Sequence, residues 1–170
     1  MTPFDLAMMF VLEQEGGYTN DAEDPGGETN FGICKRSYPN LDIPNLTLDR
    51  AKDIYRRDYW ERARCDDLPG GVAVMQFDCA VNQGVGAAAK FLQLAASVKP
   101  DGAVGPKTLA AVAALPIDRL LTEYAARRMA HYGRLPHFAE FGLGWSRRLM
   151  RCLSLSLATA ATLEGKEAHV

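Results

Sequence analysis

The sequence predicts a mainly α-helical α+β fold, with a small β-hairpin region near residues 18–33. Its 170 residues are 48% hydrophobic, which is enough to bury one substantial core. Apolar residues recur with helical spacing over most of the chain. Turn-forming residues gather instead in the segment 18–33, which has too few apolar positions for a helix. We therefore expect one mostly helical domain with a small β element.

The first helix is expected close to the N-terminus. Thr2 can cap it, with Pro3 at the first helical position and Asp5 three residues after the cap. The apolar residues that follow extend this helix to about Glu15. Gly16-Gly17 then ends it, because a glycine just past the last turn readily takes the left-handed conformation. The turn-rich segment follows directly.

The rest of the chain is expected to form a succession of helices separated by glycine and proline. Thr47 can cap the first of these, and Gly84 and Gly86 should interrupt the apolar stretch that follows Pro69-Gly70-Gly71. Pro106 is suited to open a later helix. The expected helices cover residues 47–60, 72–83, 87–97, 106–115, 116–132 and 136–163.

No repeat, linker or shift of composition marks a domain boundary. We expect a single domain over residues 1–170, in which residues 1–68 hold Glu15 and the β element and residues 69–163 form a helical lobe. Residues 164–170 are expected to be a frayed tail. The apolar C-terminal stretch with Arg147, Arg148 and Arg151 beside it suits either a packed terminal helix or a membrane-seeking one.

Charge and cysteine content limit the partners and cofactors. The 19 basic and 21 acidic residues give a net charge of −2, which provides no global attraction to nucleic acid. The four cysteines lack the spacing of zinc ligands, so we expect neither a metal nor another cofactor. The N-terminus lacks the basic region of a secretory signal, so we expect synthesis in a reducing cytoplasm and free thiols.

Two carboxyl groups flank the first turn-rich loop in a way that suits glycoside hydrolysis. That reaction needs one protonated carboxyl to donate to the leaving oxygen and one ionised carboxyl to activate water. Glu15 is the candidate acid, because the negative end of the helix macrodipole disfavours a charged carboxylate there. Asp24, in a polar loop, should stay ionised, and the hydroxyl of Thr29 could hold a water beside it. Taken alone, Glu15 is also compatible with the polar end of a helix, and Asp24 with a turn.

These residues resemble a known signature. Glu15-Gly-Gly-Tyr18, Asp24-Pro-Gly-Gly, Thr29 and Gly32-Ile33 are similar to the N-terminal motif of glycoside hydrolase family 108. The resemblance implies a lysozyme-like fold and the activity of phage endolysins and related bacterial muramidases. The order of acid, aspartate and threonine is also similar to the triad of T-even-phage lysozymes, which implies an inverting mechanism, although the spacing from Asp24 to Thr29 is one residue shorter here.

A second resemblance lies downstream. Phe77-Asp78-x-Ala80-Val81-Asn82-Gln83-Gly84, Leu92-Gln93 and Asp101-Gly102-x-x-Gly105-Pro106-x-Thr108 are similar to the peptidoglycan-binding region of these enzymes, here residues 72–112. The amides of Asn82 and Gln83 suit the N-acetyl and hydroxyl groups of a sugar, but they could equally satisfy backbone groups at a helix end. Tyr18, next to the acid, could stack on a sugar ring.

The resemblances imply a monomeric hydrolase that cleaves the β-1,4 bond between N-acetylmuramic acid and N-acetylglucosamine in peptidoglycan. A lytic transglycosylase and a non-catalytic wall-binding module remain alternatives, and a cysteine peptidase using Cys34 is a weaker one. Without a signal peptide, an enzyme of the periplasmic cell wall needs release through a holin, as in phage endolysins, or injection as a toxin with an immunity protein.

Overall fold

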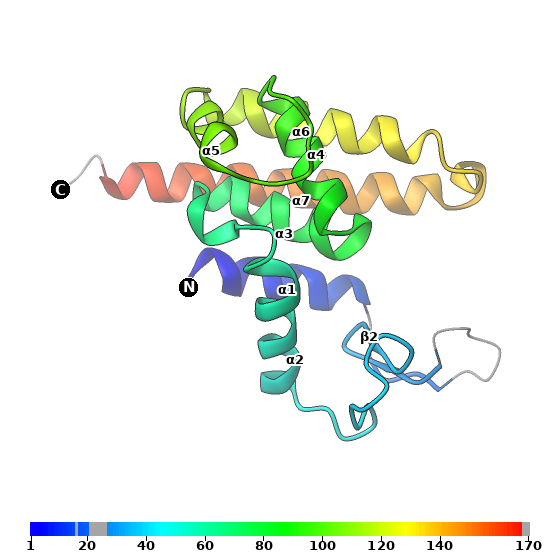
Figure 1. Cartoon of the computed structure of the whole chain (residues 1–170). Helices are drawn as coiled ribbons and strands as arrows, with labels where there is room; N and C mark the ends of the chain where they lie inside the picture. The colour runs from blue at the N-terminus through cyan, green and yellow to red at the C-terminus, as the bar shows by residue number, and fades with distance from the viewer. Residues whose placement is uncertain (16, 21–26, 168–170) are drawn as a thin grey trace.

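The computed structural model describes the chain except residues 16, 21–26 and 168–170. In that part the chain forms seven α-helices and one two-stranded antiparallel sheet (Figure 1). The elements are α1 (Pro3–Glu15), β1 (Thr29–Asn30), β2 (Ile33–Cys34), α2 (Leu48–Tyr55), α3 (Gly70–Gln83), α4 (Val85–Ala95), α5 (Pro106–Ala113), α6 (Ile117–Tyr132) and α7 (Phe138–Glu167). The expected mainly helical fold with a small β element is confirmed.

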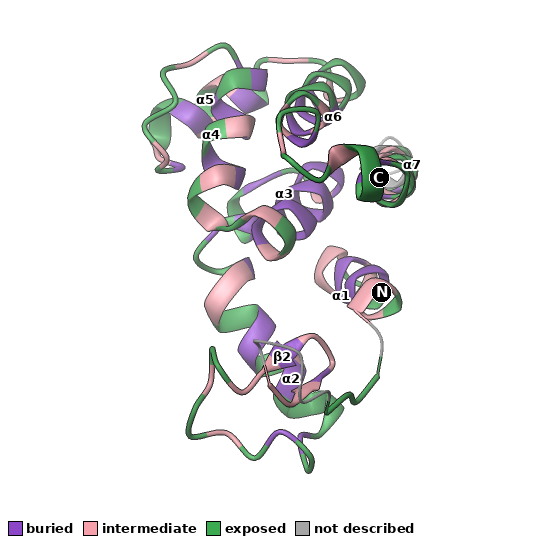
Figure 2. Cartoon of the chain, turned by 90° about the vertical axis from the view of Figure 1, so that its right-hand side faces the viewer, coloured by how far each residue is buried: buried purple, intermediate pink, exposed green. Residues whose placement is uncertain are grey.

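Helix α3 is the centre of the fold. Its residues from Gly71 to Ala80 are all buried, because α1, α4, α6 and α7 pack around it. An apolar sequence on every face of a helix is typical of such a position. Figure 2 shows α3 among these helices, while α2 and the β-hairpin form a smaller part of the molecule beyond α1. Helix α1 therefore connects the helical core with the part that contains the hairpin.

Helix α1 begins as the sequence predicts. The backbone N–H of Asp5 donates to Thr2 Oγ1 at 3.2 Å, and the backbone N–H of Thr2 donates to Asp5 Oδ2 at 2.9 Å. This reciprocal pair satisfies two backbone donors that would otherwise have no partner at the helix start. The predicted cap of α2 is confirmed too, because Thr47 Oγ1 accepts from the backbone N–H of Arg50 at 3.2 Å. A π-helical turn (Arg56–Trp60) then continues α2 to the expected end.

The hairpin is built on a tight turn at Phe31-Gly32. Strands β1 and β2 pair Thr29 with Cys34 and Asn30 with Ile33, which leaves Phe31 and Gly32 as the two central residues. Their φ values are 51° and 76°, as a type I′ turn requires. The backbone of Thr19 also pairs with Thr29, so the segment after α1 joins the sheet. The predicted β-hairpin in this region is confirmed.

Several expected helix boundaries are wrong by one to four residues. Gly86 does not interrupt a helix, because α3 ends at Gln83, Gly84 makes the break with a φ of 90°, and α4 already begins at Val85. Helix α7 continues past Leu163 to Glu167, so the first part of the expected tail is helical.

The terminal helix packs as part of the core. Leu149, Cys152 and Ala160 are buried on the side of α7 that meets α3 and α6. Packing thus accounts for the apolar C-terminal stretch, and none of the helices in the described ranges is long and apolar enough to span a membrane. All four cysteines are free thiols, as expected.

Candidate active site

Glu15 is the last residue of α1 and lies against the hairpin turn. Its side chain is 26% exposed. A Cβ placed on Gly32 would lie 2.8 Å from the Cβ of Glu15 and 2.9 Å from its Cγ. The Tyr55 hydroxyl would lie 2.6 Å from the same added Cβ. This hydroxyl donates to the carbonyl of Phe31 at 2.9 Å. Only a glycine fits between the acid and this tyrosine.

The Tyr55 hydroxyl keeps its proton in this position. Burial, and after it the charge of Glu15, raise the pKa of Tyr55 well above its usual range. The hydroxyl therefore remains a donor to the turn at neutral and alkaline pH. It holds the turn at a fixed place beside Glu15.

Arg148 is the partner of Glu15. Its Nη1 donates to Glu15 Oε1 at 2.9 Å, and its side chain is only 12% exposed. Burial alone would lower the pKa of Arg148, but Asp78 and Glu15 outweigh it and raise this pKa. The sequence predicts the negative end of the α1 macrodipole at Glu15, and the structure adds a cation, Arg148, beside the same carboxyl group.

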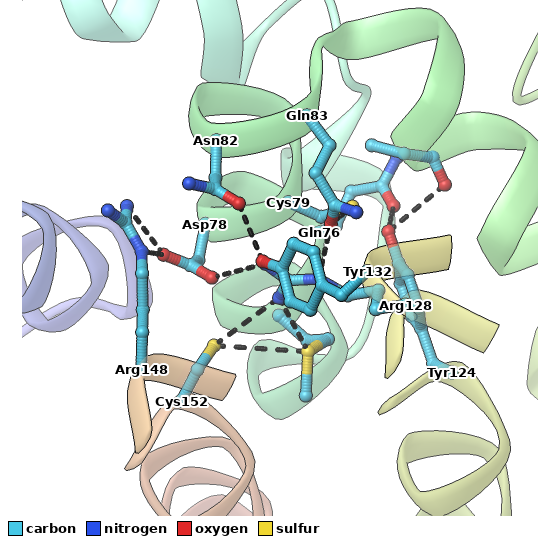
Figure 3. Close-up of polar contacts among 12 residues, drawn as sticks. Gln76, Asp78, Cys79, Asn82, Gln83, Tyr124, Arg128, Tyr132, Arg148 and Cys152 are labelled. Carbon is cyan, nitrogen blue, oxygen red and sulfur yellow. Dashed lines mark hydrogen bonds and ion pairs between the residues drawn. The ribbon is translucent and has the colours of Figure 1, made fainter. Parts of the chain in front are cut away.

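The same guanidinium reaches a buried carboxylate in α3. Arg148 Nε donates to Asp78 Oδ1 at 2.9 Å, and Arg128 Nη2, from α6, donates to Asp78 Oδ2 at 2.7 Å. The Asp78 and Arg128 side chains are 1% and 0% exposed. Figure 3 shows Asp78 between the two arginines. Glu15, Arg148, Asp78 and Arg128 are called the ion-pair chain below.

Sequence reasoning missed this chain of charges. In the sequence, Arg148 stands out only as one of the arginines beside the apolar C-terminal stretch, and Asp78 only as part of a longer motif. Arg128 carried no signal, since a single arginine in a helix is ordinarily solvent-exposed. The available signal was an aspartate in an otherwise apolar helix, which must find a charged or hydrogen-bonded partner when it is buried.

Asn82 and Gln83, the predicted sugar contacts, lie beside the ion-pair chain at the end of α3. Asn82 is exposed, and its Oδ1 accepts from the Tyr132 hydroxyl at 2.6 Å. Gln83 is partly buried, and its Oε1 accepts from Arg128 Nε at 2.8 Å (Figure 3). Both amides are thus engaged by the protein through their oxygens, but Asn82 is exposed to solvent, whereas Gln83 is partly buried.

The remaining predicted residues lie on or near the hairpin. Thr29 Oγ1 donates to the carbonyl of Gly27 at 3.2 Å. Tyr18 is 48% exposed, and its hydroxyl donates to Glu28 Oε1 at 3.4 Å. Asp24 lies outside the described residues. The structure therefore brings Glu15 and the hairpin of Thr29 together, while the place of Asp24 stays a prediction.

The geometry around Glu15 suits proton donation. A partly exposed carboxyl that is held through one oxygen can present the other oxygen to a substrate, which is the geometric requirement for a general acid. No cluster of potential metal ligands occurs among the residues that the structure describes.

Two protein-family models match successive parts of the chain. Residues 8–84 match the family model described as glycosyl hydrolase 108, and residues 87–150 match that of a predicted peptidoglycan domain. The second match starts and ends later than the expected region 72–112. No curated protein matches the chain.

A solved structure extends the similarity over nearly the whole chain. The structure of Brucella abortus SagA is 39% identical, with a TM-score of 0.82, over 92% of this chain and 95% of that one. The fold is thus lysozyme-like, and the two family matches together identify a glycoside hydrolase of peptidoglycan. The chain belongs to the glycosyl hydrolase 108 family.

Proposed function

We propose that the protein is a muramidase that cleaves the β-1,4 bond between N-acetylmuramic acid and N-acetylglucosamine, with Glu15 as its general acid. One observation carries this proposal: Glu15 ends α1 in contact with the hairpin turn, partly exposed and held through one carboxyl oxygen by Arg148. A second acid, Asp24, stands in the sequence between α1 and the hairpin, and hydrolysis of a glycosidic bond requires such a pair of carboxyl groups.

In the proposed reaction, protonated Glu15 gives its proton to the glycosidic oxygen as the bond to the anomeric carbon breaks. A water molecule attacks that carbon from the opposite face and inverts its configuration. Asp24, helped by Thr29, takes the proton of this water. Glu15 is left as a carboxylate beside Arg148, which stabilises the negative charge that the step creates. Asp24 then releases its proton to solvent, and solvent returns a proton to Glu15.

The substrate is a glycan strand of peptidoglycan. Asn82 is exposed beside the ion-pair chain and carries an amide N–H₂ that suits an N-acetyl carbonyl. Tyr18, exposed next to the acid, presents a ring on which a sugar could stack. We propose both as substrate contacts, and Gln83, next to Asn82 at the end of α3, as a further one; its Nε2 is buried and has no hydrogen-bond partner among the described residues.

Digestion of purified sacculi tests the proposal. The wild type is compared with Glu15→Gln, which removes the acid proton at nearly constant size. The control is Glu13→Gln, an exposed glutamate on the same helix. We expect wild type and Glu13→Gln to release reducing muropeptides, and Glu15→Gln to be at least ~100-fold slower. Equal activity of all three would make Glu15 structural. Binding to sacculi without digestion by any of them would identify a wall-binding module.

Product chemistry tests the mechanism. An inverting hydrolase releases the α-anomer first, which proton NMR of a fresh digest detects. A β-anomer would establish retention, and a 1,6-anhydro product would establish a lytic transglycosylase. Asp24→Asn should abolish the hydrolysis if Asp24 activates the water, whereas Asp42→Asn, at an exposed turn further along the chain, should not.

The enzyme is proposed to act as a monomer on the periplasmic cell wall. Holin-dependent release would fit a phage endolysin, and an immunity protein would fit an injected toxin. The genes beside that of the protein distinguish the two settings.

A further inference from the structure

Asp78 is shared between two arginines, and each arginine takes a different carboxyl oxygen. Oδ1 accepts from Arg148 at 2.9 Å and Oδ2 from Arg128 at 2.7 Å. The carboxylate cannot rotate without losing both contacts. Because the side chain is 1% exposed, water cannot replace either contact. Asp78 therefore has one favourable orientation.

Arg128 in turn is fixed on every side. Its Nε donates to Gln83 Oε1 at 2.8 Å, Nη1 contacts Met75 Sδ at 3.2 Å, and Nη2 reaches the Tyr132 hydroxyl at 3.4 Å as well as Asp78. Its side chain is 0% exposed. A guanidinium that is held through all three of its nitrogens has almost no freedom to move (Figure 3).

We propose that Asp78 and Arg128 form a buried positioning unit that holds Arg148 against Glu15. The inference rests on the proposed function, in which Glu15 is the general acid. In the pair of Glu15 and Arg148, the position of the arginine depends on its contact with Asp78, which Arg128 holds from the other side. Without Asp78, its long side chain could turn outward, because it lies near the surface and is 12% exposed.

The chain of charges also explains why two arginines are present. Two guanidinium groups and two carboxylates alternate along it, so each negative group has a positive neighbour. When Glu15 gives up its proton, the new charge forms beside a cation that is already in place. Pre-positioned charge is effective because no reorganisation is needed at the moment of reaction. A lysine at position 148 would lack the planar fork that contacts both carboxylates at once.

The ion-pair chain joins the two parts of the protein that match different family models. Glu15 and Asp78 lie in residues 8–84, whereas Arg128 and Arg148 lie in residues 87–150. The second segment therefore supplies residues that the acid needs, whatever contacts it makes with peptidoglycan. It completes the active site.

A double-mutant cycle tests this inference. The kcat on soluble, uncrosslinked peptidoglycan oligomers is measured for wild type, Asp78→Asn, Arg148→Met and the double variant. We expect each single variant to lose roughly 10- to 100-fold in kcat with little change in KM, because misplacement of a reacting group by about 1 Å has an effect of that size. If Asp78 acts through Arg148, the double variant should match Arg148→Met within about 2-fold.

Controls separate positioning from general charge effects. Arg147→Met removes an exposed arginine next in sequence and should keep the kcat of wild type. Arg148→Lys should recover part of the loss, since it keeps the charge near Glu15 but not the fork. A purely structural Asp78 would lower stability and leave the kcat of the folded enzyme unchanged. Losses that multiply in the double variant, or an unchanged kcat in folded Asp78→Asn, would overturn the inference.

A second measurement does not depend on activity. The Nε–Hε group of a hydrogen-bonded arginine is protected from exchange and visible by NMR, and Arg148→Lys assigns the signal of Arg148. In Asp78→Asn this signal should shift or disappear, and an unchanged signal would contradict the positioning unit. An inactive wild type, in contrast, would overturn the muramidase proposal. If Asp78→Asn does not fold, Asp78→Asn with Arg128→Met removes both buried charges and should give the same loss of kcat and the same change of the Arg148 signal.

Discussion

Gly32 and Glu15 are in direct contact: a Cβ on the glycine would lie 2.8 Å from the Cβ of the acid. Gly32 also has a φ of 76°, which other residues rarely adopt. Gly32→Ala must therefore move Glu15, Tyr55 or the turn itself. The contact ties the stability of the hairpin to the position of the acid.

Gly32→Ala should lower both stability and activity. Left-handed backbone alone costs a residue with a Cβ about 1 to 2 kcal/mol, and the contacts with Glu15 and Tyr55 should add to this. Urea unfolding measures the total. Gly27→Ala is the matched control, because Gly27 has a φ of 69° but its Cβ would meet, among the described residues, only Lys35 Cβ at 3.8 Å. An equal loss of stability in both variants would show that the close contact has no cost.

Tyr55→Phe should destabilise the protein by about 1 kcal/mol, since it removes the donor to the Phe31 carbonyl from a buried site. Because the same turn touches Glu15, the activity on sacculi should fall too. Tyr18→Phe, which removes an exposed hydroxyl, should leave the free energy of unfolding within about 0.5 kcal/mol of wild type. If Tyr55→Phe kept full stability and activity, the hydrogen bond from Tyr55 to the turn would not determine the position of Glu15.

The buried pair of Asp78 and Arg128 should show strongly non-additive stability. Arg128→Met leaves Asp78 with one of its two cations, and Asp78→Asn leaves Arg128 buried without a counter-charge. Breaking such a pair typically costs about 3 to 5 kcal/mol. Removing both charges together should cost clearly less than the sum of the two single variants. Denaturant titration of the three variants measures this, and additive losses would mean that the two charges do not stabilise each other.

Stability should decline in alkaline solution because of the buried thiols. Burial raises the pKa of Cys79 to about 11, while an unfolded cysteine titrates near 9.0. The folded state therefore keeps a proton that the unfolded state loses. The resulting stability is fully present below about pH 9 and is lost progressively as the pH rises towards 11.

Cys79→Ala should flatten this decline by up to about 1.4 kcal/mol per pH unit. Cys34→Ala is the control, because the Ser37 hydroxyl lowers the pKa of this partly exposed thiol, so its removal should not flatten the slope. Free energies of unfolding at pH 7 to 11 give the comparison. An identical slope in Cys79→Ala and wild type would assign the alkaline loss to other groups, of which buried Cys65 and Cys152 are the first candidates.

Local signals in the sequence predict much of the fold. The cap at Thr2, the end of α1 at Glu15 and the hairpin around Phe31-Gly32 all depend on neighbouring residues, and all three are confirmed. Gly86 was misjudged because an exposed glycine with open space around it is tolerated in the first turn of a helix. Propensity therefore predicts where helices lie better than where they end.

The ion-pair chain could not be predicted in the same way. Glu15 and Arg148 are 133 positions apart, and Arg148 and Asp78 are 70 apart. Such pairs depend on how α1, α3 and α7 pack, which no local pattern determines. The motif predicts Glu15 as the acid, while Arg148, the cation that contacts it, lies in a segment in which the sequence analysis recognised no motif.

The distance in sequence between Glu15 and Arg148 has a consequence for biosynthesis. The acid leaves the ribosome near the beginning of translation, and its cation emerges only when most of the chain has been made. A nascent chain, or a fragment that stops before residue 148, carries the complete N-terminal signature and still lacks the counter-ion of its acid. Synthesis of the last helix thus sets the time at which the newly made chain can form the ion pair of Glu15 and Arg148.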